Sequence, residues 1–125
     1  MSQKLPLTTA NGYIIDQMGN RLRLQSVNWY GASDADNIVM GLDINSVSNI
    51  AALIKSIGFN SVRLPFSNQM LHQPDPVATD RQTDRLTGNP YLSGKSPLEV
   101  FDTVVEALAE EGLLVILNNH TTTST

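Results

Sequence analysis

Hydrophobic residues recur at spacings of three and four in two stretches of the chain, residues 47–57 and residues 101–108. Residues three and four apart share one face of an α-helix, so each stretch is predicted to form an amphipathic helix. A short apolar run follows each helix, at residues 61–64 and 113–117. Both runs are predicted to be strands, and the unbroken run 113–117 is typical of a parallel strand covered on both faces.

The ends of both predicted helices carry residues that start or stop helical hydrogen bonding. Asn45 or Ser46 can cap the first helix, and Gly58 can end it in the left-handed conformation. The second helix begins with the capping-box sequence 96–99, which has proline at the first helical position, and Gly112 ends it. The helix boundaries are therefore predicted independently of the apolar faces.

The part of the chain before these helices shows a different pattern. Residues 13–16 and 21–24 are two short strand candidates, and the turn-forming residues 18–20 between them predict a β-hairpin. The second arm runs into residues 24–29, an alternating segment that is predicted to be the first strand of the main domain. Residues 1–11 are predicted to be a flexible arm, and residues 12–125 to form the domain.

After the hairpin, predicted strands and helices alternate, which indicates parallel strands joined by helical crossovers. The long polar segment 67–95 is predicted to be a loop. An open dinucleotide-binding sheet would have a glycine-rich turn after its first strand, and residues 28–31 do not form one. The predicted fold class is therefore α/β: the amino-terminal portion of a (βα)8 TIM barrel with a preceding β-hairpin, about three barrel strands and two helices.

Composition and charge exclude several functions. Of the 125 residues, 41% are hydrophobic and the formal net charge is −4, so the clustered Lys and Arg of a nucleic-acid surface are not expected. No apolar run approaches the roughly 18 residues of a membrane helix. The chain has no cysteine, which excludes disulfides and thiolate metal sites within these residues. We therefore expect neither a nucleic-acid partner nor a membrane span.

Polar side chains stand at the carboxyl ends of the predicted barrel strands, where α/β proteins place their ligands. Arg63 follows the second strand and His120 follows the third. Considered alone, Arg63 could form a routine ion pair and His120 could be an ordinary loop histidine. Trp29, at the end of the first strand, could stack on a sugar ring or belong to the barrel core. The residues by themselves leave these alternatives open.

Three blocks of the sequence, residues 24–31, 57–66 and 115–120, resemble the amino-terminal part of cellulases of glycoside hydrolase family 5. The resemblance implies a (βα)8 barrel that hydrolyses β-linked glycans, often β-1,4-glucan, with retention at the anomeric carbon. It also implies a secreted protein, a β-glucan or related oligosaccharide as the substrate, and a mechanism without a metal or organic cofactor. Residues 1–6 show no signal-peptide pattern.

The resemblance also implies roles for individual residues. Arg63 matches the family arginine that hydrogen-bonds the catalytic nucleophile and orients it. His120 matches the family histidine that binds hydroxyl groups of the sugar, and Asn119 is expected to assist it. Trp29 is expected to bind substrate if it does not belong to the core. The family frequently has aspartate at the position of Asn118, which is assigned no role.

Retaining hydrolysis needs two carboxylates, and in this family both are glutamates that follow the fourth and seventh barrel strands. The chain is expected to stop after its third barrel strand, so the catalytic pair is expected outside these residues. The 125 residues alone are then predicted to be inactive, with the complementary remainder of the barrel as their partner. None of the glutamates present matches a catalytic motif, and all lie on or at the end of the second helix: Glu99, Glu106, Glu110 and Glu111.

Two other interpretations are weighed against this one. The chain could be a non-catalytic carbohydrate-binding or folding fragment of a partial barrel. It could also belong to an unrelated barrel enzyme that handles phosphorylated or metal-bound substrates, but this segment lacks the corresponding phosphate- and metal-binding motifs.

Overall fold

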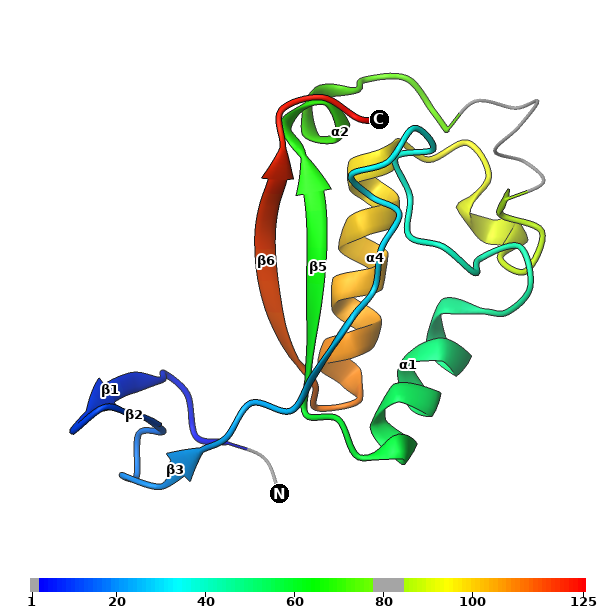
Figure 1. Ribbon diagram of the computed structural model, residues 1–125. Helices are drawn as coiled ribbons and strands as arrows, with labels where there is room; N and C mark the ends of the chain where they lie inside the picture. Colours follow the sequence, from blue (N-terminus) through cyan, green and yellow to red (C-terminus); the bar gives the residue numbers. More distant parts are fainter. Residues whose placement is uncertain (1–2, 78–84) are drawn as a thin grey trace.

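A computed structural model describes residues 3–77 and 85–125 of the chain. The described residues form a small antiparallel sheet at the amino-terminal end and a parallel sheet covered by helices (Figure 1). The elements follow in the order β1 (Thr8–Ala10), β2 (Tyr13–Ile15), β3 (Arg21–Leu22), β4 (Ser26–Asn28), α1 (Val47–Ile57), β5 (Ser61–Ser67), α2 (Asn68–His72), the 3₁₀ helix η1 (Pro90–Leu92), α4 (Pro97–Glu110) and β6 (Leu114–Thr121).

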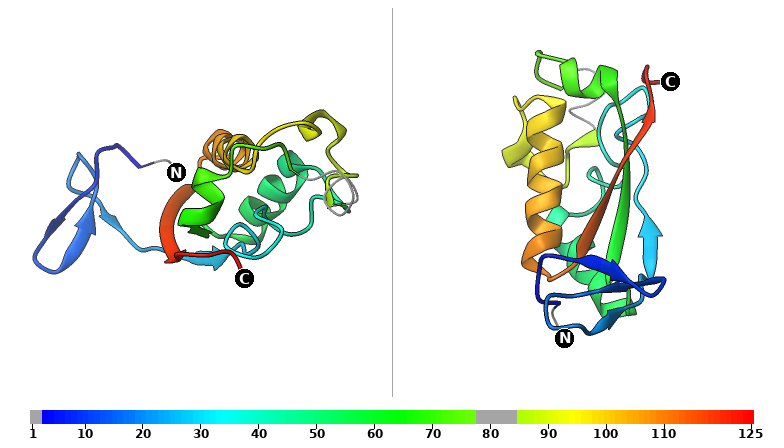
Figure 2. Two further views of the ribbon diagram at one scale, coloured as in Figure 1. Left: turned by 90° about the horizontal axis from the view of Figure 1, so that it is seen from above. Right: turned by 90° about the vertical axis from the view of Figure 1, so that its left-hand side faces the viewer.

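The parallel sheet has the strand order β4-β5-β6, which is also the order of these strands along the chain. Val27, Val62 and Val115 pair across the three strands at one level. Helices α1 and α4 lie on the same side of the sheet, as Figures 1 and 2 show. Consecutive parallel strands joined by helices on one side are the repeating unit of a (βα)8 barrel, which confirms the predicted fold class.

The predicted helix boundaries are confirmed by their capping contacts. The Ser46 hydroxyl accepts a hydrogen bond from the backbone N–H of Asn49 at the start of α1, and Gly58 ends this helix with a φ of 113°. At the start of α4, Ser96 and Glu99 exchange side-chain-to-backbone hydrogen bonds, which is the predicted capping box. These local signals place each helix so that its apolar stripe meets the sheet.

The core lies between the sheet and the helices. Val62 and Leu64, which alternate along β5, are both fully buried and face α1 and α4. Phe66, the next residue on this face, has its ring centroid 5.9 Å from that of Phe101 on α4. Because side chains alternate along a strand, Arg63 lies on the opposite face of the sheet.

Two predictions for the segment around β5 are corrected. The strand was predicted to cover residues 61–64, but it continues to Ser67, and Pro65 pairs with Asn118 of β6. Proline fixes φ at a value that an extended strand tolerates, and it costs the ladder only one N–H. The segment 67–95 was predicted to be a loop, but it contains α2 and η1; residues 78–84 of this segment lie outside the described residues.

The amino-terminal hairpin is confirmed, but it is larger than predicted. Strand β1 pairs with β2, so Thr8–Ala10 belong to a three-stranded sheet and not to a flexible arm. The pairing satisfies backbone groups that a free arm would leave to water, and the N–H of Gln17 also donates to the carbonyl of Lys4 at 2.7 Å. Figure 1 shows this sheet near the end of the molecule where β5 begins.

Asp16 holds the turn of this sheet together. Its carboxylate accepts hydrogen bonds from the backbone N–H groups of Met18 and Asn20, each at 2.9 Å, and from that of Lys4. Burial opposes ionisation of this carboxyl, but the hydrogen bonds from Asn20, Lys4 and Met18 outweigh it, so the pKa of Asp16 lies below its ordinary value of 3.8. The ionised form is therefore the one that stabilises the turn.

We expect this turn to lose order in acid. Since the pKa of Asp16 is lower in the folded chain than in the unfolded chain, its stabilisation is complete above 3.8 and disappears as the pH falls through the folded pKa. The amide resonances of Met18 and Asn20, followed by NMR during acid titration, should report this change together. Asp16→Asn keeps the acceptor oxygen but does not titrate, so its amide resonances should stay constant. If the unaltered chain and Asp16→Asn gave identical titrations, Asp16 would not be the group that controls the turn.

Candidate active site

The face of the parallel sheet that the helices leave uncovered carries the polar side chains predicted for the site. Asn28, Arg63 and Ile116 pair across β4, β5 and β6. Paired residues of adjacent parallel strands point to the same side of the sheet, so all three lie on the face opposite the core. Asn118 pairs with Pro65, two residues beyond Arg63, and therefore lies on this same face.

Arg63 is held by a short chain of hydrogen bonds across the first two barrel strands. Its Nη1 donates to Oδ1 of Asn28 at 3.3 Å, and Nδ2 of Asn28 donates to the hydroxyl of Tyr30 at 3.1 Å. Arg63 is half-buried, whereas Asn28 and Tyr30 are exposed. The sequence alone does not indicate a role for Asn28, because only strand pairing places this residue beside Arg63.

His120 lies near the carboxyl end of β6 and is exposed. Its Nδ1 is 3.1 Å from Nδ2 of Asn118, so the two side chains meet on the face that carries Arg63. Asn118 was assigned no role, yet it is the residue that contacts the predicted sugar-binding histidine. The structure thus brings Arg63 and His120 to one face, on neighbouring strands. His120 lies at the predicted strand end, but Arg63 is the third residue of β5, because this strand continues to Ser67.

Asn119 does not join this group. It pairs with Phe66, whose side chain faces the helices, and its own Nδ2 donates to Oδ1 of Asn68 in α2 at 3.0 Å. The alternation of side chains along β6 places it on the face opposite to that of Asn118. The expectation that Asn119 assists His120 is therefore corrected: its side-chain amide links the end of β6 to α2.

Trp29 belongs to the core. Only 7% of its surface is exposed, and its indole Nε1 donates to the carbonyl of Met40 at 2.8 Å. As the residue after Asn28, it points toward the opposite side of the sheet and packs with the buried cluster. Stacking on a sugar requires an exposed ring face, so the expected substrate-binding role of Trp29 is replaced by the core alternative.

The segments at the carboxyl ends of the three barrel strands are bonded to one another. The hydroxyl of Ser124, after β6, meets that of Ser67 at the end of β5 at 2.7 Å, and it also donates to Oδ1 of Asn37 in the loop after β4. The N–H of Ser124 donates to Oε1 of Gln69 at 2.8 Å. Figure 1 shows the carboxyl terminus beside α2 at this end of the sheet.

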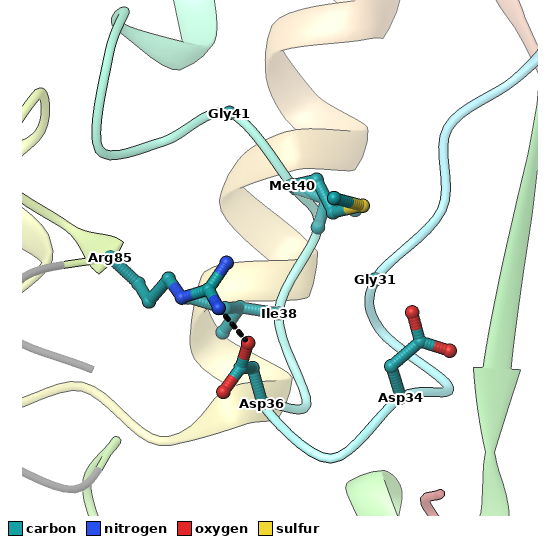
Figure 3. A pocket seen from close by; sticks show the side chains of 8 residues that line it. Gly31, Asp34, Asp36, Ile38, Met40, Gly41 and Arg85 are labelled. Carbon is teal, nitrogen blue, oxygen red and sulfur yellow. Dashed lines mark ion pairs between the residues drawn. The ribbon is translucent and has the colours of Figure 1, made fainter. Parts of the chain in front are cut away.

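A cavity of about 220 Å³ lies at the loop after β4 (Figure 3). One wall holds an ion pair between Arg85 and Asp36, with 3.2 Å between Nη2 and Oδ2. None of the predicted site residues lines this cavity, so it is distinct from the open face that carries Arg63. The residues around it are Gly31, Asp34, Asp36, Ile38, Val39, Met40, Gly41 and Arg85.

The glutamates of the chain lie on the helix side of the parallel sheet. Every glutamate lies on α4 or at its end, and α4 covers the opposite face of the sheet. Glu99 is engaged in the capping box, where hydrogen bonds from Ser96 lower its pKa. Residues 3–77 and 85–125 also contain no cluster of three or more potential metal ligands, and no helix long and apolar enough to cross a membrane.

A protein-family model matches most of the chain. The family model described as "Cellulase (glycosyl hydrolase family 5)" matches residues 16–125. An endoglucanase of Paenibacillus polymyxa is 28% identical over 115 residues, which cover 90% of this chain and 27% of that protein. A glycosyl hydrolase 5 family protein of Chamaecyparis obtusa is 36% identical over 132 residues, covering 95% of this chain and 24% of the relative. The chain thus spans about a quarter of the length of these relatives.

Solved structures show the same fold. The catalytic domain of the major endoglucanase from Xanthomonas campestris superposes with a TM-score of 0.81 at 26% identity, covering 96% of this chain and 34% of that domain. An endocellulase from Pyrococcus horikoshii in complex with cellotetraose gives a TM-score of 0.74 at 27% identity, with 90% and 30% covered. The match over residues 16–125, together with the shared barrel geometry, confirms the resemblance: the chain belongs to the cellulase family, glycosyl hydrolase family 5.

Proposed function

We propose that this chain forms one side of the active site of a retaining glycoside hydrolase that cleaves β-linked glucan, in the manner of an endo-β-1,4-glucanase. The observation that carries the proposal is the placement of Arg63 and His120 on one face of adjacent parallel strands. Family membership supports it, because the relatives in the family include endoglucanases. In this proposal the chain contributes substrate binding and orientation of the nucleophile.

Arg63 is proposed to hold the nucleophilic carboxylate. A guanidinium has five N–H donors in a planar fork, and the bond to Asn28 engages Nη1 and steadies the group. A carboxylate beside this positive charge is kept ionised, because a neighbouring opposite charge favours the charged form. An ionised and oriented carboxylate is what the nucleophilic step of retaining hydrolysis needs.

His120 is proposed to bind hydroxyl groups of the sugar ring nearest to the nucleophile. The ring is exposed on the Arg63 face and lies a few residues further along the strand direction, at about 3.3 Å per residue. The cellotetraose complex of the Pyrococcus horikoshii endocellulase supports an oligosaccharide of β-linked glucose as the ligand. None of these steps calls for a metal or an organic cofactor.

The complementary remainder of the barrel is the proposed partner. Strands β4 and β6 are the outer strands of the described sheet, and an outer strand presents unpaired backbone groups that another strand can join. Leu117 on β6 is 64% exposed, whereas Leu64, its neighbour on β5, is fully buried. A further strand and helix docked against β6 would bury Leu117 as α4 buries Leu64.

Secretion is part of the same proposal. The Xanthomonas campestris relative is a major extracellular endoglucanase, and an enzyme that acts on polysaccharide needs access to an insoluble or very large substrate outside the cell.

The proposal is tested with cellotetraose, by calorimetry for binding and by product analysis for cleavage. We expect the chain alone to bind the oligosaccharide weakly without cleaving it, and the complete barrel to cleave it. Glu99→Gln in the complete barrel is the matched control, and it should leave turnover unchanged because Glu99 caps α4.

Cleavage by the chain alone would refute the assignment of both catalytic carboxylates to the rest of the barrel. Binding by the complete barrel without cleavage would favour the alternative of a non-catalytic carbohydrate-binding protein. Failure of the complete barrel both to bind and to cleave would refute the glucan substrate.

A further inference from the structure

The pair of side chains formed by Asn118 and His120 constrains the chemistry of the imidazole. The two residues are two positions apart on β6, and the amide Nδ2 of Asn118 lies 3.1 Å from Nδ1 of His120. The intervening Asn119 points to the other face and bonds to Asn68. The contact is therefore made within one strand, on the face that carries Arg63.

An amide NH₂ group can donate hydrogen bonds but cannot accept them. The ring nitrogen that faces it must offer its lone pair, so the proton of the neutral imidazole has to reside on the other nitrogen, Nε2. In the orientation that the structure shows, the amide of Asn118 is thus compatible with one of the two neutral tautomers of His120.

We propose that Asn118 is a positioning residue that keeps the proton of the neutral His120 imidazole on Nε2, so that the ring presents a hydrogen-bond donor on the Arg63 face. The acceptor for this donor is a hydroxyl oxygen of the glycan, and this part of the inference rests on the proposed function. An aspartate at position 118 would have the opposite effect, because a carboxylate only accepts and would draw the proton to Nδ1.

The position of the proton can be measured by NMR without any activity assay. The chain has two histidines, His72 and His120, and His72 is exposed in the last turn of α2, where it serves as an internal reference. We would record long-range ¹H–¹⁵N correlation spectra of the ¹⁵N-labelled chain at a pH of about 8, where an ordinary imidazole is neutral. The variant His72→Gln assigns the signals.

The expected result is that Nδ1 of His120 resonates as an unprotonated nitrogen and Nε2 as a protonated one, with Asn118→Asp reversing the two and Asn118→Ala giving a mixture. A protonated Nδ1 in the unaltered chain, or a proton distribution equal to that of His72, would overturn the inference. If a variant fails to fold, the spectrum of the unaltered chain still decides the question.

Addition of cellotetraose to the ¹⁵N-labelled complete barrel separates this inference from the proposed function. A shift of the Nε2–H signal of His120 supports the role of this donor in glycan binding. If cellotetraose leaves the signal unchanged in the complete barrel, the proposed substrate fails, while the position of the proton still decides the role of Asn118.

Discussion

Replacing Asn89 with alanine is expected to lower the free energy of unfolding by about 3–5 kcal/mol. The side chain is fully buried. Its Oδ1 accepts from the N–H of Val47 at 2.9 Å, and its Nδ2 donates to the carbonyls of Leu42 at 3.0 Å and Asn45 at 2.9 Å. Alanine would leave the N–H of Val47 and the carbonyl of Asn45 without this partner, whereas the carbonyl of Leu42 would keep its bond from the N–H of Gly88. Each buried unsatisfied group costs about 1–3 kcal/mol. Urea unfolding followed by circular dichroism measures the change.

Asn49→Ala is the matched control. Asn49 is an exposed asparagine on α1 whose side chain bonds to Asn45, so its loss should cost less than about 1 kcal/mol. The neighbouring residue, Gly88, packs closely against the same loop. A Cβ at this position would lie 2.8 Å from the carbonyl oxygen of Leu42, which accounts for the glycine. If Asn89→Ala were no more destabilising than Asn49→Ala, the packing of the loop after β4 against residues 88–89 would be wrong.

Replacing Arg63 with alanine in the complete barrel is expected to reduce kcat/KM for a cello-oligosaccharide by roughly 100- to 1,000-fold, the range seen when one charge-stabilising donor is removed. Without the guanidinium, the pKa of the nucleophilic carboxyl should rise, since its neighbouring positive charge is lost. The acid limb of the pH dependence of kcat/KM should then move to higher pH. This shift separates a role beside the nucleophile from a purely structural one.

Two further variants sharpen the test of Arg63. Arg63→Lys keeps the charge but loses the planar guanidinium. Its kcat/KM should therefore lie between that of Arg63→Ala and that of the unaltered protein. Arg23→Ala removes an exposed arginine that lies between β3 and β4, and it should change kcat/KM by less than about twofold. A loss of activity in Arg63→Ala without any shift of the acid limb would contradict the proposed contact with the nucleophile.

The helices and the central strands of this protein follow from short-range features of its sequence. The spacing of apolar residues in α1 and α4 requires only neighbouring turns of one helix, and the caps at Ser46 and Ser96 require only residues three positions away. The strands that carry Arg63 and His120 begin shortly after Gly58 and Gly112, which end the helices before them. The resemblance blocks then connected these strand ends to a known family, which the comparisons confirmed.

Other features were decided by contacts between distant parts of the chain. Strand β1 was missed because Thr8–Ala10 become a strand only by pairing with β2. Asn89 was overlooked because its three partners lie more than 40 residues earlier in the sequence. No local pattern marks a side chain whose function is to satisfy backbone groups of a remote loop.

The sequence by itself determined which elements form and which strand ends carry polar side chains, because those features depend on residues within a few positions of one another. Only the tertiary structure decided which side chains share the site. Strand pairing placed Asn118 beside His120, turned Asn119 toward α2 and buried Trp29 in the core. Adjacent residues of a strand point to opposite faces, so a choice between neighbours at the end of a strand requires the register with the next strand.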